Sequence, residues 1–386
     1  MASVTRFFKG SPQHFFLFGP RGTGKSTWLK QHYPDAVLID LLAPDVFRLY
    51  SARPERLREI ASGAVGKIII IDEVQKIPEL LNVVHQLIEE DSGFQFILTG
   101  SSARKLKRSG VDLLAGRALV KTMHPFMAAE LERSFSLTKS LQRGLVPLIN
   151  SSQNPQETLA SYIAIYVREE VQTEGIIRNI GAFNRFLEAV SFSHGSTINI
   201  SEVARECQVK RKTVDNYIAV LEDLLLSFRV PVFSRRAKRH LVTHPKFYYF
   251  DSGVFRSLRP AGPLDSPHEI DGAALEGLIA QHLRAWIAYS NRPCNLYYWR
   301  TKSGVEVDFI LYGQDTLLAL EVKNSAGIKS KMLKGLSTFQ KDYPGAQALL
   351  LYRGNERLLI NNILCLPCEQ FLQKLIPGKL ITADYF

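Results

Sequence analysis

The chain has 386 residues, of which 46% are hydrophobic. This length is enough for two or three domains with cores of their own, and this apolar fraction excludes an intrinsically disordered chain. The sequence has no apolar run of about 18 residues and no apolar signal segment near its N-terminus, which predicts a cytoplasmic protein that does not associate with membranes.

The charge balance favours anionic partners. Lysine and arginine number 48, and aspartate and glutamate number 37, which gives a formal net charge of +11. Such an excess favours polyanions, nucleic acid above all, and on its own it also suits a protein that binds nucleotides or acidic partners. The four cysteines are expected to be buried free thiols, because only Cys365 and Cys368 have metal-like spacing and no second Cys or His pair lies nearby.

The first chemical motif is a glycine-rich loop that directly follows an apolar run at residues 15–18. Residues 19–26 fit the P-loop pattern, and a helix is expected to begin at the end of the loop. Backbone N–H groups of the loop and the N-terminus of the helix then face a phosphate. We expect Lys25 to reach the β- and γ-phosphates and Ser26 to bind Mg²⁺. The predicted nucleotide-binding residues here are Gly19, Arg21, Gly22, Thr23, Gly24, Lys25, Ser26 and Thr27.

A second apolar run, residues 67–71, predicts a strand buried on both faces of a parallel sheet. Two carboxylates follow it, at the end of the strand where such sheets bind ligands. Asp72 is predicted to hold Mg²⁺, directly or through water, and Glu73 to orient or deprotonate the water that attacks the γ-phosphate. The alternative is that both residues only begin the next helix, whose dipole favours acidic side chains.

The third strand of this region, residues 94–98, ends in hydroxyl side chains. Thr99, Ser101 and Ser102 are candidates to sense the γ-phosphate. Arg104 and Arg117 are candidates to place a guanidinium at a nucleotide, in the same subunit or in a neighbour. The alternative for either arginine is a solvated position near the start of a helix.

Taken in order, the motifs at residues 18–26, 71–78, 98–104 and 114–117 resemble a prokaryotic family of AAA-type ATPases, whose C-terminal domain has a restriction-endonuclease-like core and a long unassigned function. The resemblance covers nearly the whole chain. It implies an AAA-type α/β nucleotide-binding fold, ATP as ligand and a homo-oligomeric ring such as a hexamer. The chain departs from the family at the polar sensor position, where Asn is common and the hydroxyl cluster at Thr99 stands here.

The middle of the chain begins after a polar stretch at residues 150–155, a plausible domain boundary. Residues 200–207 and 211–226 read as a helix-turn-helix, and the continuation to residue 250 completes a winged helix. Winged helices bind DNA or pack against other domains, and both readings stay open. Basic residues oppose the dipole at a helix start, which hints at an anionic ligand. The candidate DNA contacts near the start of the second helix are Lys210, Arg211, Lys212 and Asn216.

The last third carries a second chemical pattern. Residues 297–311 read as a hairpin and residues 317–323 as the next strand. The period of two puts Glu321 and Lys323 on one face, and Asp308 lies within reach of them if the strands are antiparallel neighbours. Glu276, in an expected helix, covers the same edge.

This residue set is what metal-dependent phosphodiester hydrolysis needs. Carboxylates hold Mg²⁺ or Mn²⁺ against the scissile phosphate, and a lysine orients the water and offsets developing charge. The set resembles the core of the restriction-endonuclease superfamily, whose helix glutamate, aspartate and Glu-x-Lys positions are matched by Glu276, Asp308, Glu321 and Lys323. The alternative is a solvated Glu/Lys strand face. Glu306 is expected to be an exposed residue, and the alternative is that it is an additional metal ligand.

The sequence therefore predicts an α/β chain with an AAA-type ATPase domain at residues 1–150, a helical and winged-helix connector at 151–255, and a restriction-endonuclease-like domain at 256–386. The predicted function is ATP-dependent DNA processing, with an ATPase coupled to a metal-dependent nuclease. One alternative is an ATPase motor or clamp whose last domain only binds DNA or oligomerises. The other is an ATP-switched regulator that binds protein partners. The predicted catalytic residues are Glu73, Asp308, Glu321 and Lys323, and the predicted metal ligands are Ser26, Asp72, Glu276, Asp308 and Glu321.

Overall fold

The computed structural model describes residues 4–63, 66–101, 114–167, 179–382 and 385. The chain forms two compact units. The N-terminal unit comprises residues 8–124 and 220–226, and the C-terminal unit comprises the rest. The first stretch of the N-terminal unit therefore ends at His124 rather than near residue 150. Most of the predicted connector, apart from residues 220–226, lies in the same unit as the last third of the chain.

The N-terminal unit is built on a five-stranded sheet in the order β2-β3-β4-β1-β5, with every neighbouring pair parallel. The apolar runs form its central strands because a parallel sheet is covered on both faces, and all four residues of β1 are buried. Its strands are β1 (Phe15–Phe18), β2 (Val37–Asp40), β3 (Ile68–Asp72), β4 (Gln95–Gly100) and β5 (Leu119–Thr122).

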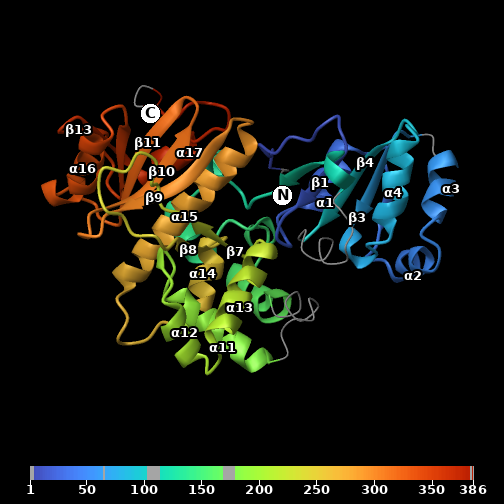
Figure 1. The fold of residues 1–386 in the computed structure, drawn as a ribbon, viewed down its shortest axis with the longest axis horizontal. Coiled ribbons are helices and arrows are strands. Elements are labelled where there is room, and N and C mark those ends of the chain that lie inside the picture. Colours follow the sequence, from blue (N-terminus) through green and yellow to red (C-terminus); the bar gives the residue numbers. More distant parts are fainter. Residues whose placement is uncertain (1–3, 64–65, 102–113, 168–178, 383–384, 386) are drawn as a thin grey trace. The chain divides into compact units, whose positions relative to one another are not determined.

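Helices cover both faces of this sheet (Figure 1). On one face, Phe16 and Ile71 pack with residues of α3 and α4, such as Leu57 and Val84, in a single apolar core. On the other face lies α1, which buries Trp28 and Leu29. The helices of this unit are α1 (Lys25–His32), α2 (Pro44–Ala52), α3 (Arg56–Gly63) and α4 (Leu80–Glu89), with short 3₁₀ turns η1 (Val74–Lys76) and η2 (Leu114–Gly116).

The C-terminal unit contains a mixed six-stranded sheet in the order β13-β14-β12-β11-β10-β9. Neighbours are antiparallel from β9 to β11, parallel from β11 to β14, and antiparallel again at β13. Helix α16 covers one face, where Leu336 and Phe339 join a core with Ile310 and Leu350. The strands are β9 (Cys294–Arg300), β10 (Glu306–Gly313), β11 (Thr316–Lys323), β12 (Gln347–Tyr352), β13 (Leu358–Ile360) and β14 (Ile363–Pro367), and the helices around them are α15 (Pro267–Tyr289), η5 (Ser330–Leu333), α16 (Lys334–Asp342) and α17 (Cys368–Lys374).

The predicted helix-turn-helix and hairpin are present, and all of their residues except 220–226 belong to the C-terminal unit. Two helices joined by a short turn precede an antiparallel pair of strands, and a third strand makes the sheet order β6-β8-β7. These elements are α11 (Ile180–Ser191), β6 (Ser196–Thr197), α12 (Ile200–Glu206), α13 (Arg211–Asp223), β7 (Ser227–Val230) and β8 (Lys246–Tyr249).

The other helices that the structure describes in the C-terminal unit are short. They are α6 (Ala128–Leu131), η3 (Glu132–Ser134), α7 (Leu137–Arg143), α8 (Pro147–Asn150), α9 (Pro155–Ser161), the π-helix η4 (Tyr162–Val167) and α14 (Ser252–Leu258). Among the helices that the structure describes, none has the length and apolar character needed to cross a membrane.

Candidate functional site

The loop between β1 and α1 has the backbone conformation that its glycines permit. Gly22 and Gly24 have φ angles of 79° and 92°, which residues with a side chain rarely adopt. At Gly19 a Cβ atom would lie 2.6 Å from the carbonyl oxygen of Met123, so the close approach of the two backbones excludes a side chain. Helix α1 then begins at Lys25, as predicted from the motif.

Within the loop, a buried ammonium donates hydrogen bonds to backbone carbonyl groups. Lys25 is 6% exposed, and its Nζ donates hydrogen bonds to the carbonyl oxygens of Gly19, at 2.6 Å, and Pro20, at 3.4 Å. The buried Thr23 hydroxyl donates to the Pro20 carbonyl at 2.8 Å. The loop therefore positions a positive charge at the start of α1, where the helix dipole also favours an anion. Arg21 and Thr27, predicted at the same site, are exposed.

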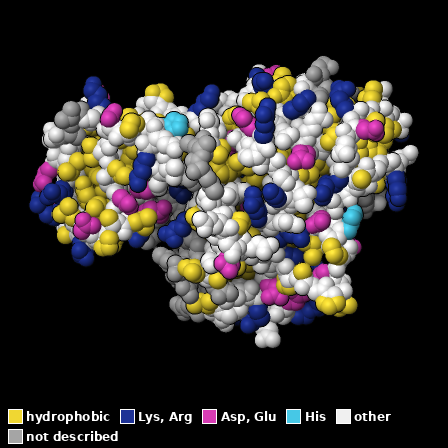
Figure 2. Space-filling model, turned by 180° about the vertical axis from the view of Figure 1, so that it is seen from behind, with side chains coloured by type: hydrophobic (Ala, Val, Ile, Leu, Met, Phe, Trp, Pro, Cys, Tyr) yellow, Lys and Arg dark blue, Asp and Glu magenta, His cyan; other side chains and the backbone are white. Residues whose placement is uncertain are grey.

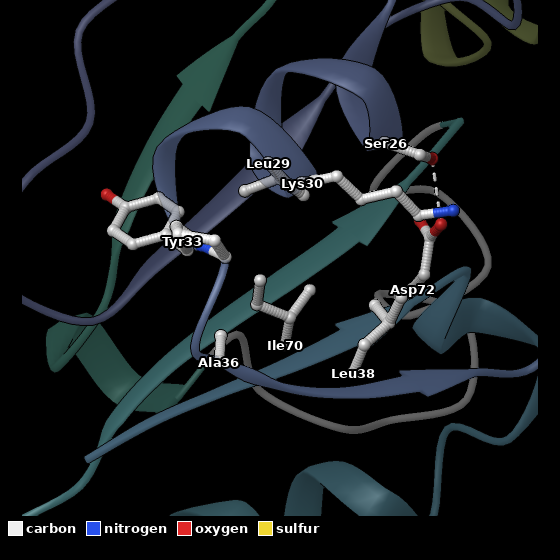
Figure 3. Close-up of a pocket in the computed structure, with 9 residues that line it drawn as sticks. Ser26, Leu29, Lys30, Tyr33, Ala36, Leu38, Ile70 and Asp72 are labelled. Atoms are coloured by element: carbon white, nitrogen blue, oxygen red, sulfur yellow. Dashed lines mark hydrogen bonds between the residues drawn. The ribbon is translucent and has the colours of Figure 1, made fainter. Parts of the chain in front are cut away.

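Three elements meet at Asp72. Ser26 Oγ, on α1, donates to Asp72 Oδ2 at 2.8 Å (Figure 3), and the Thr99 hydroxyl, at the end of β4, donates to Asp72 Oδ1. A hydroxyl and a carboxylate are hard oxygen ligands of the kind that Mg²⁺ prefers, so Ser26 and Asp72 fit this ion. Thr99 was predicted to sense the γ-phosphate, and in this structure its hydroxyl holds Asp72 and accepts the Glu73 N–H at 3.2 Å.

Glu73 follows Asp72 in an unusual backbone conformation. Its φ of 60° and ψ of 44° lie in the left-handed region, where strain is often associated with function. Its Oε2 accepts a hydrogen bond from Gln75 Nε2 at 2.5 Å, and the same nitrogen lies 3.4 Å from Ser101 Oγ. Glu73 stands directly before the turn η1, but its side chain makes no capping hydrogen bond there.

Gln75 was not predicted from the sequence as a site residue. The one feature of the sequence that could have indicated Gln75 was its position two residues after Glu73. A Cβ atom at Gly100 would lie 2.5 Å from Gln75 Oε1, so the glycine at the end of β4 provides the space for this amide. Among the described residues Gln75 Oε1 is buried without a hydrogen-bond partner.

Of the two arginines predicted to reach a nucleotide, the structure describes Arg117. Arg117 forms an ion pair with Glu89, and both side chains are partly exposed, which fits the alternative of a solvated position. Ser102 and Arg104 lie outside the residues that the structure describes.

A hollow of about 200 Å³ opens beside the Ser26–Asp72 pair (Figure 3). It lies between α1 and the strands β2 and β3, so an apolar space adjoins the polar pair. No pattern in the sequence indicates this hollow. The hollow is lined by Ser26, Leu29, Lys30, Tyr33, Pro34, Ala36, Leu38, Ile70 and Asp72.

The C-terminal unit brings the second set of predicted residues together. Strands β10 and β11 are antiparallel neighbours, as the prediction required, with Phe309 opposite Leu320. Asp308 Oδ2 accepts the backbone N–H of Val322 at 2.8 Å, and the ammonium of Lys323 contacts Glu321 Oε1. The register of β10 on β9 shifts between Val307 and Ile310, and irregularities of this kind often re-aim a side chain at a functional site.

A lysine that was not predicted stands among these carboxylates. Lys246, on β8, has a side chain that is 4% exposed, and its Nζ lies 2.9 Å from Glu276 Oε1 and 3.4 Å from Asp308 Oδ1. Nζ also contacts Glu306 Oε1, so Glu306 belongs to the cluster rather than to the solvated surface. Tyr248 Oη, two residues along β8, donates to Glu276 Oε1 at 2.6 Å. We call Glu276, Glu306, Asp308, Glu321, Lys246 and Lys323 the carboxylate cluster.

Burial and charge shift the pKa values in this cluster. Burial raises the pKa of Glu276 to about 7, against the effect of Lys246. Burial and the neighbouring Asp308 raise the pKa of Glu321 to about 8. Burial opposes the charge of Lys246, but the surrounding acidic groups raise its pKa well above the ordinary value. Both lysines therefore stay charged, and Glu276 and Glu321 hold their protons more tightly than ordinary carboxyl groups do.

The cluster does not enclose a metal position. Glu276, Asp308 and Glu321 were predicted to ligate a divalent ion, and the ammonium of Lys246 lies between the first two. In the described part of the chain, no group of three or more His, Cys, Asp or Glu side chains is arranged to hold a metal ion. The predicted residues thus converge, but in this arrangement they do not fit Mg²⁺ or Mn²⁺.

Two relatives of this chain are proteins without an assigned activity. "Uncharacterized protein Rv2008c" of Mycobacterium tuberculosis is 25% identical over 371 residues, which cover 92% of this chain and 80% of the relative. "Uncharacterized protein MJ1544" of Methanocaldococcus jannaschii is 25% identical over 334 residues, which cover 78% and 72%.

Two solved structures are similar only at a low level. The replication initiator DnaA bound to AMPPCP and single-stranded DNA matches with a TM-score of 0.23 and 14% identity, over 54% of this chain and 82% of DnaA. Protein VC1899 from Vibrio cholerae matches with a TM-score of 0.22 and 12% identity, over 89% of this chain and 96% of that protein.

Three family models match successive parts of the chain. Residues 271–371 match a domain of unknown function (DUF4143), and residues 134–265 match another (DUF8612). Residues 11–132 match an AAA domain, and this range contains the P-loop, the Ser26–Asp72 pair and Glu73. The N-terminal part of the chain is thus an AAA-type ATPase domain, for which ATP and Mg²⁺ are the expected ligands.

Proposed function

We propose that this protein is an ATPase that acts on DNA, with the AAA-type domain hydrolysing ATP and the C-terminal unit contacting the nucleic acid. The ATPase half of the proposal depends on one observation above all, the Ser26–Asp72 hydrogen bond at the start of α1. It joins the motif of the P-loop to the acidic end of β3, two segments 46 residues apart in the chain.

In this proposal, each residue of the nucleotide site has a distinct task. Lys25 and the loop N–H groups bind the phosphates, and Ser26 and Asp72 hold Mg²⁺, which offsets the charge of the phosphates when it is bound. Glu73 orients the attacking water and accepts its proton. Gln75 fixes the carboxylate of Glu73 through the 2.5 Å hydrogen bond, so this amide sets the direction in which Glu73 points.

The proposal that DNA is the partner is supported by the winged helix. Helix α13 begins at Arg211, and the consecutive basic residues Lys210, Arg211 and Lys212 are all exposed at that end. On the face shown in Figure 2, Lys and Arg side chains lie scattered among acidic and apolar ones rather than in one large patch. The start of α13 is therefore our assignment for the phosphate contacts of DNA.

DNA cleavage by the carboxylate cluster is a second candidate function. It is favoured by the convergence of Glu276, Asp308, Glu321 and Lys323, which are spread over about 50 residues of sequence and come from one helix and two strands. An interaction module has no need of this arrangement. Among the described residues, Glu321 Oε2 is buried and has no hydrogen-bond partner, as expected of a group whose partner is a bound ligand.

We also propose that the chain assembles into a homo-oligomeric ring, because AAA-type domains commonly complete their nucleotide sites between subunits. In a ring, Arg104 or Arg117 is the candidate to reach the nucleotide of a neighbour. Sedimentation of the full chain with and without ATP tests this part, and a monomer under both conditions contradicts it.

The central test uses the purified full-length protein with linear duplex, single-stranded and branched DNA, with and without ATP, in Mg²⁺ and in Mn²⁺. We expect at least one DNA form to bind and to stimulate phosphate release. Strand scission that is lost in Asp308→Ala, while phosphate release persists, supports the second candidate. If no DNA form binds or changes phosphate release, the regulator that binds protein partners becomes the better interpretation.

A further inference from the structure

Lys246 reaches the carboxylate cluster from a different sheet. It is the first residue of β8, in the three-stranded sheet of the winged helix, whereas the acidic residues stand on α15, β10 and β11. Its Nζ lies 2.9 Å from Glu276 Oε1 and 3.4 Å from Asp308 Oδ1, and it contacts Glu306 Oε1 as well. One ammonium therefore neutralises acidic groups from two elements at once.

Lys246 and Lys323 differ in their exposure to solvent, and this difference gives them different roles. The side chain of Lys246 is 4% exposed, whereas that of Lys323 is 31% exposed. A phosphate of DNA can approach the second lysine from solvent, but it cannot meet the first without a movement of β8. Lys246 therefore acts inside the protein, as a counter-ion for the carboxylates.

We propose that Lys246 is a built-in cation that occupies the position between Glu276 and Asp308 and keeps the carboxylate cluster closed to divalent metal ions until it is displaced. This inference rests on the second candidate function, DNA cleavage. It explains why residues that match a metal-dependent hydrolase do not enclose a metal position, and it makes displacement of Lys246 the step that opens the site.

The charges in the cluster support this assignment. With Lys246 in place, its ammonium provides charge compensation from within the protein that a divalent cation otherwise provides. Glu321 Oε2, which has no hydrogen-bond partner among the described residues, is a second, independent sign of an incomplete site, because a buried carboxylate oxygen normally has a partner. A metal ion that replaced the ammonium would find oxygen ligands on Glu276, Asp308 and Glu321, the three residues predicted from the sequence.

The test compares Mn²⁺ binding by the full-length wild-type protein and by Lys246→Met, measured by isothermal titration calorimetry without nucleotide. Methionine fills the volume of the lysine stem without its charge. We expect Lys246→Met to bind Mn²⁺ at least about tenfold more tightly, because one positive charge leaves a buried site. Adding Asp308→Ala should abolish the gain, which locates the ion in the cluster.

The matched control is Arg300→Met. Arg300 Nη1 lies 3.5 Å from Glu306 Oε2, and its side chain is 41% exposed, so this change removes a charge next to the cluster without emptying its interior. We expect little change in Mn²⁺ affinity. An equal gain in both variants, or no gain in Lys246→Met, would overturn the proposal.

Lys246→Met leaves several buried carboxylates without their counter-ion, which can prevent folding. The double variant Lys246→Met/Glu306→Gln removes a charge of each sign from the cluster but keeps the three predicted ligands, so the same gain in Mn²⁺ affinity is expected of it. Strand scission is measured separately. A gain in Mn²⁺ binding without any cleavage sustains the role of Lys246 and contradicts the nuclease, and cleavage without a gain in binding does the reverse.

Discussion

The two charged sites of this protein are held together by different kinds of partner. In the N-terminal unit, the carboxylate of Asp72 accepts from the hydroxyls of Ser26 and Thr99, and Lys25 donates to backbone carbonyls. In the C-terminal unit, the carboxylates of Glu276 and its neighbours surround the ammonium of Lys246.

The nucleotide site is therefore prepared for a charged ligand, whereas the carboxylate cluster already contains the charge that compensates its acidic groups. Hydrogen bonds between a charged group and a neutral hydroxyl or carbonyl are worth about 1.5 to 3 kcal/mol each, and a bound ion or phosphate offers Asp72 and Lys25 an interaction of the opposite charge in their place. A buried ion pair is different, because removal of one partner leaves an uncompensated charge and costs about 3 to 5 kcal/mol. We therefore expect ligands to enter the nucleotide site readily and the carboxylate cluster only after a rearrangement.

The largest effect that tests this comparison is expected from Lys25→Ala. Removal of the ammonium eliminates the positive charge that the loop presents to the phosphates, so phosphate release should fall by at least about 100-fold, as for the loss of a transition-state donor. Lys67→Ala is the matched control, since Lys67 is an exposed lysine directly before β3, at the opposite end of this strand from Asp72. Steady-state phosphate release measures both. Similar rates in the two variants would refute the assignment of Lys25.

The next effect is expected from Glu73→Gln. The amide keeps the shape of the side chain and its contact with Gln75, but it cannot accept a proton from water, so hydrolysis should fall by about 100-fold or more. ATP affinity should change little, because the phosphate and Mg²⁺ contacts are assigned to other residues. Equilibrium binding of labelled ATP and phosphate release separate the two quantities. Hydrolysis at the wild-type rate would remove Glu73 from the reaction.

The nucleotide site was predictable because its signals are local. The apolar runs that became β1, β3 and β4 are continuous in sequence, and each ends in the residues that carry the chemistry. The glycines at 22 and 24 point to a backbone with positive φ, which the structure has. Gln75 was missed because a glutamine in a turn has no pattern of its own, and its contact with Glu73 depends on the left-handed backbone at Glu73.

The carboxylate cluster was predictable only in part. The alternation along β10 and β11 placed Asp308 beside Glu321, and their antiparallel pairing is present. Lys246 carries no such signal, because it contacts the cluster through the packing of β8, which stands 62 residues before Asp308 in the chain. Glu306 was expected to be solvated for the same reason, since nothing in its own segment indicates a lysine opposite it.

A smaller effect concerns the DNA contacts of the C-terminal unit. Substitution of Lys210, Arg211 and Lys212 by Gln should lower the slope of DNA affinity against salt by about 0.9 for each lost phosphate contact on duplex DNA. The control is the triple Gln variant of Lys329, Lys331 and Lys334, which changes the same charge at exposed positions of the same unit. Binding is followed by fluorescence anisotropy over a range of salt. Equal slopes in both variants would assign the start of α13 to packing.

The smallest effect concerns acid stability of the C-terminal unit. His282 is 1% exposed, its Nδ1 lies 2.8 Å from the Leu278 carbonyl oxygen, and its Nε2 accepts the N–H of Ala128 at 2.9 Å. Burial lowers the pKa of His282 to about 4. Because the folded state keeps this ring neutral, its contribution to stability is present above pH 6.5 and is lost as the pH falls from 6.5 through 4, by at most about 1.4 kcal/mol for each pH unit.

His282→Gln isolates this contribution, because the Gln amide oxygen can accept the same N–H but does not titrate. The measurement uses a Trp28→Phe background, in which Trp286 and Trp299 are the remaining tryptophans and both belong to the C-terminal unit. Thermal unfolding followed by their emission should show a smaller loss of Tm between pH 6.5 and 4.5 in His282→Gln than in its parent. A parallel decline in Tm would mean that His282 takes up its proton equally in the folded and the unfolded state. The acid sensitivity of this unit would then have to come from other groups, such as the buried His194, whose pKa burial lowers to about 3.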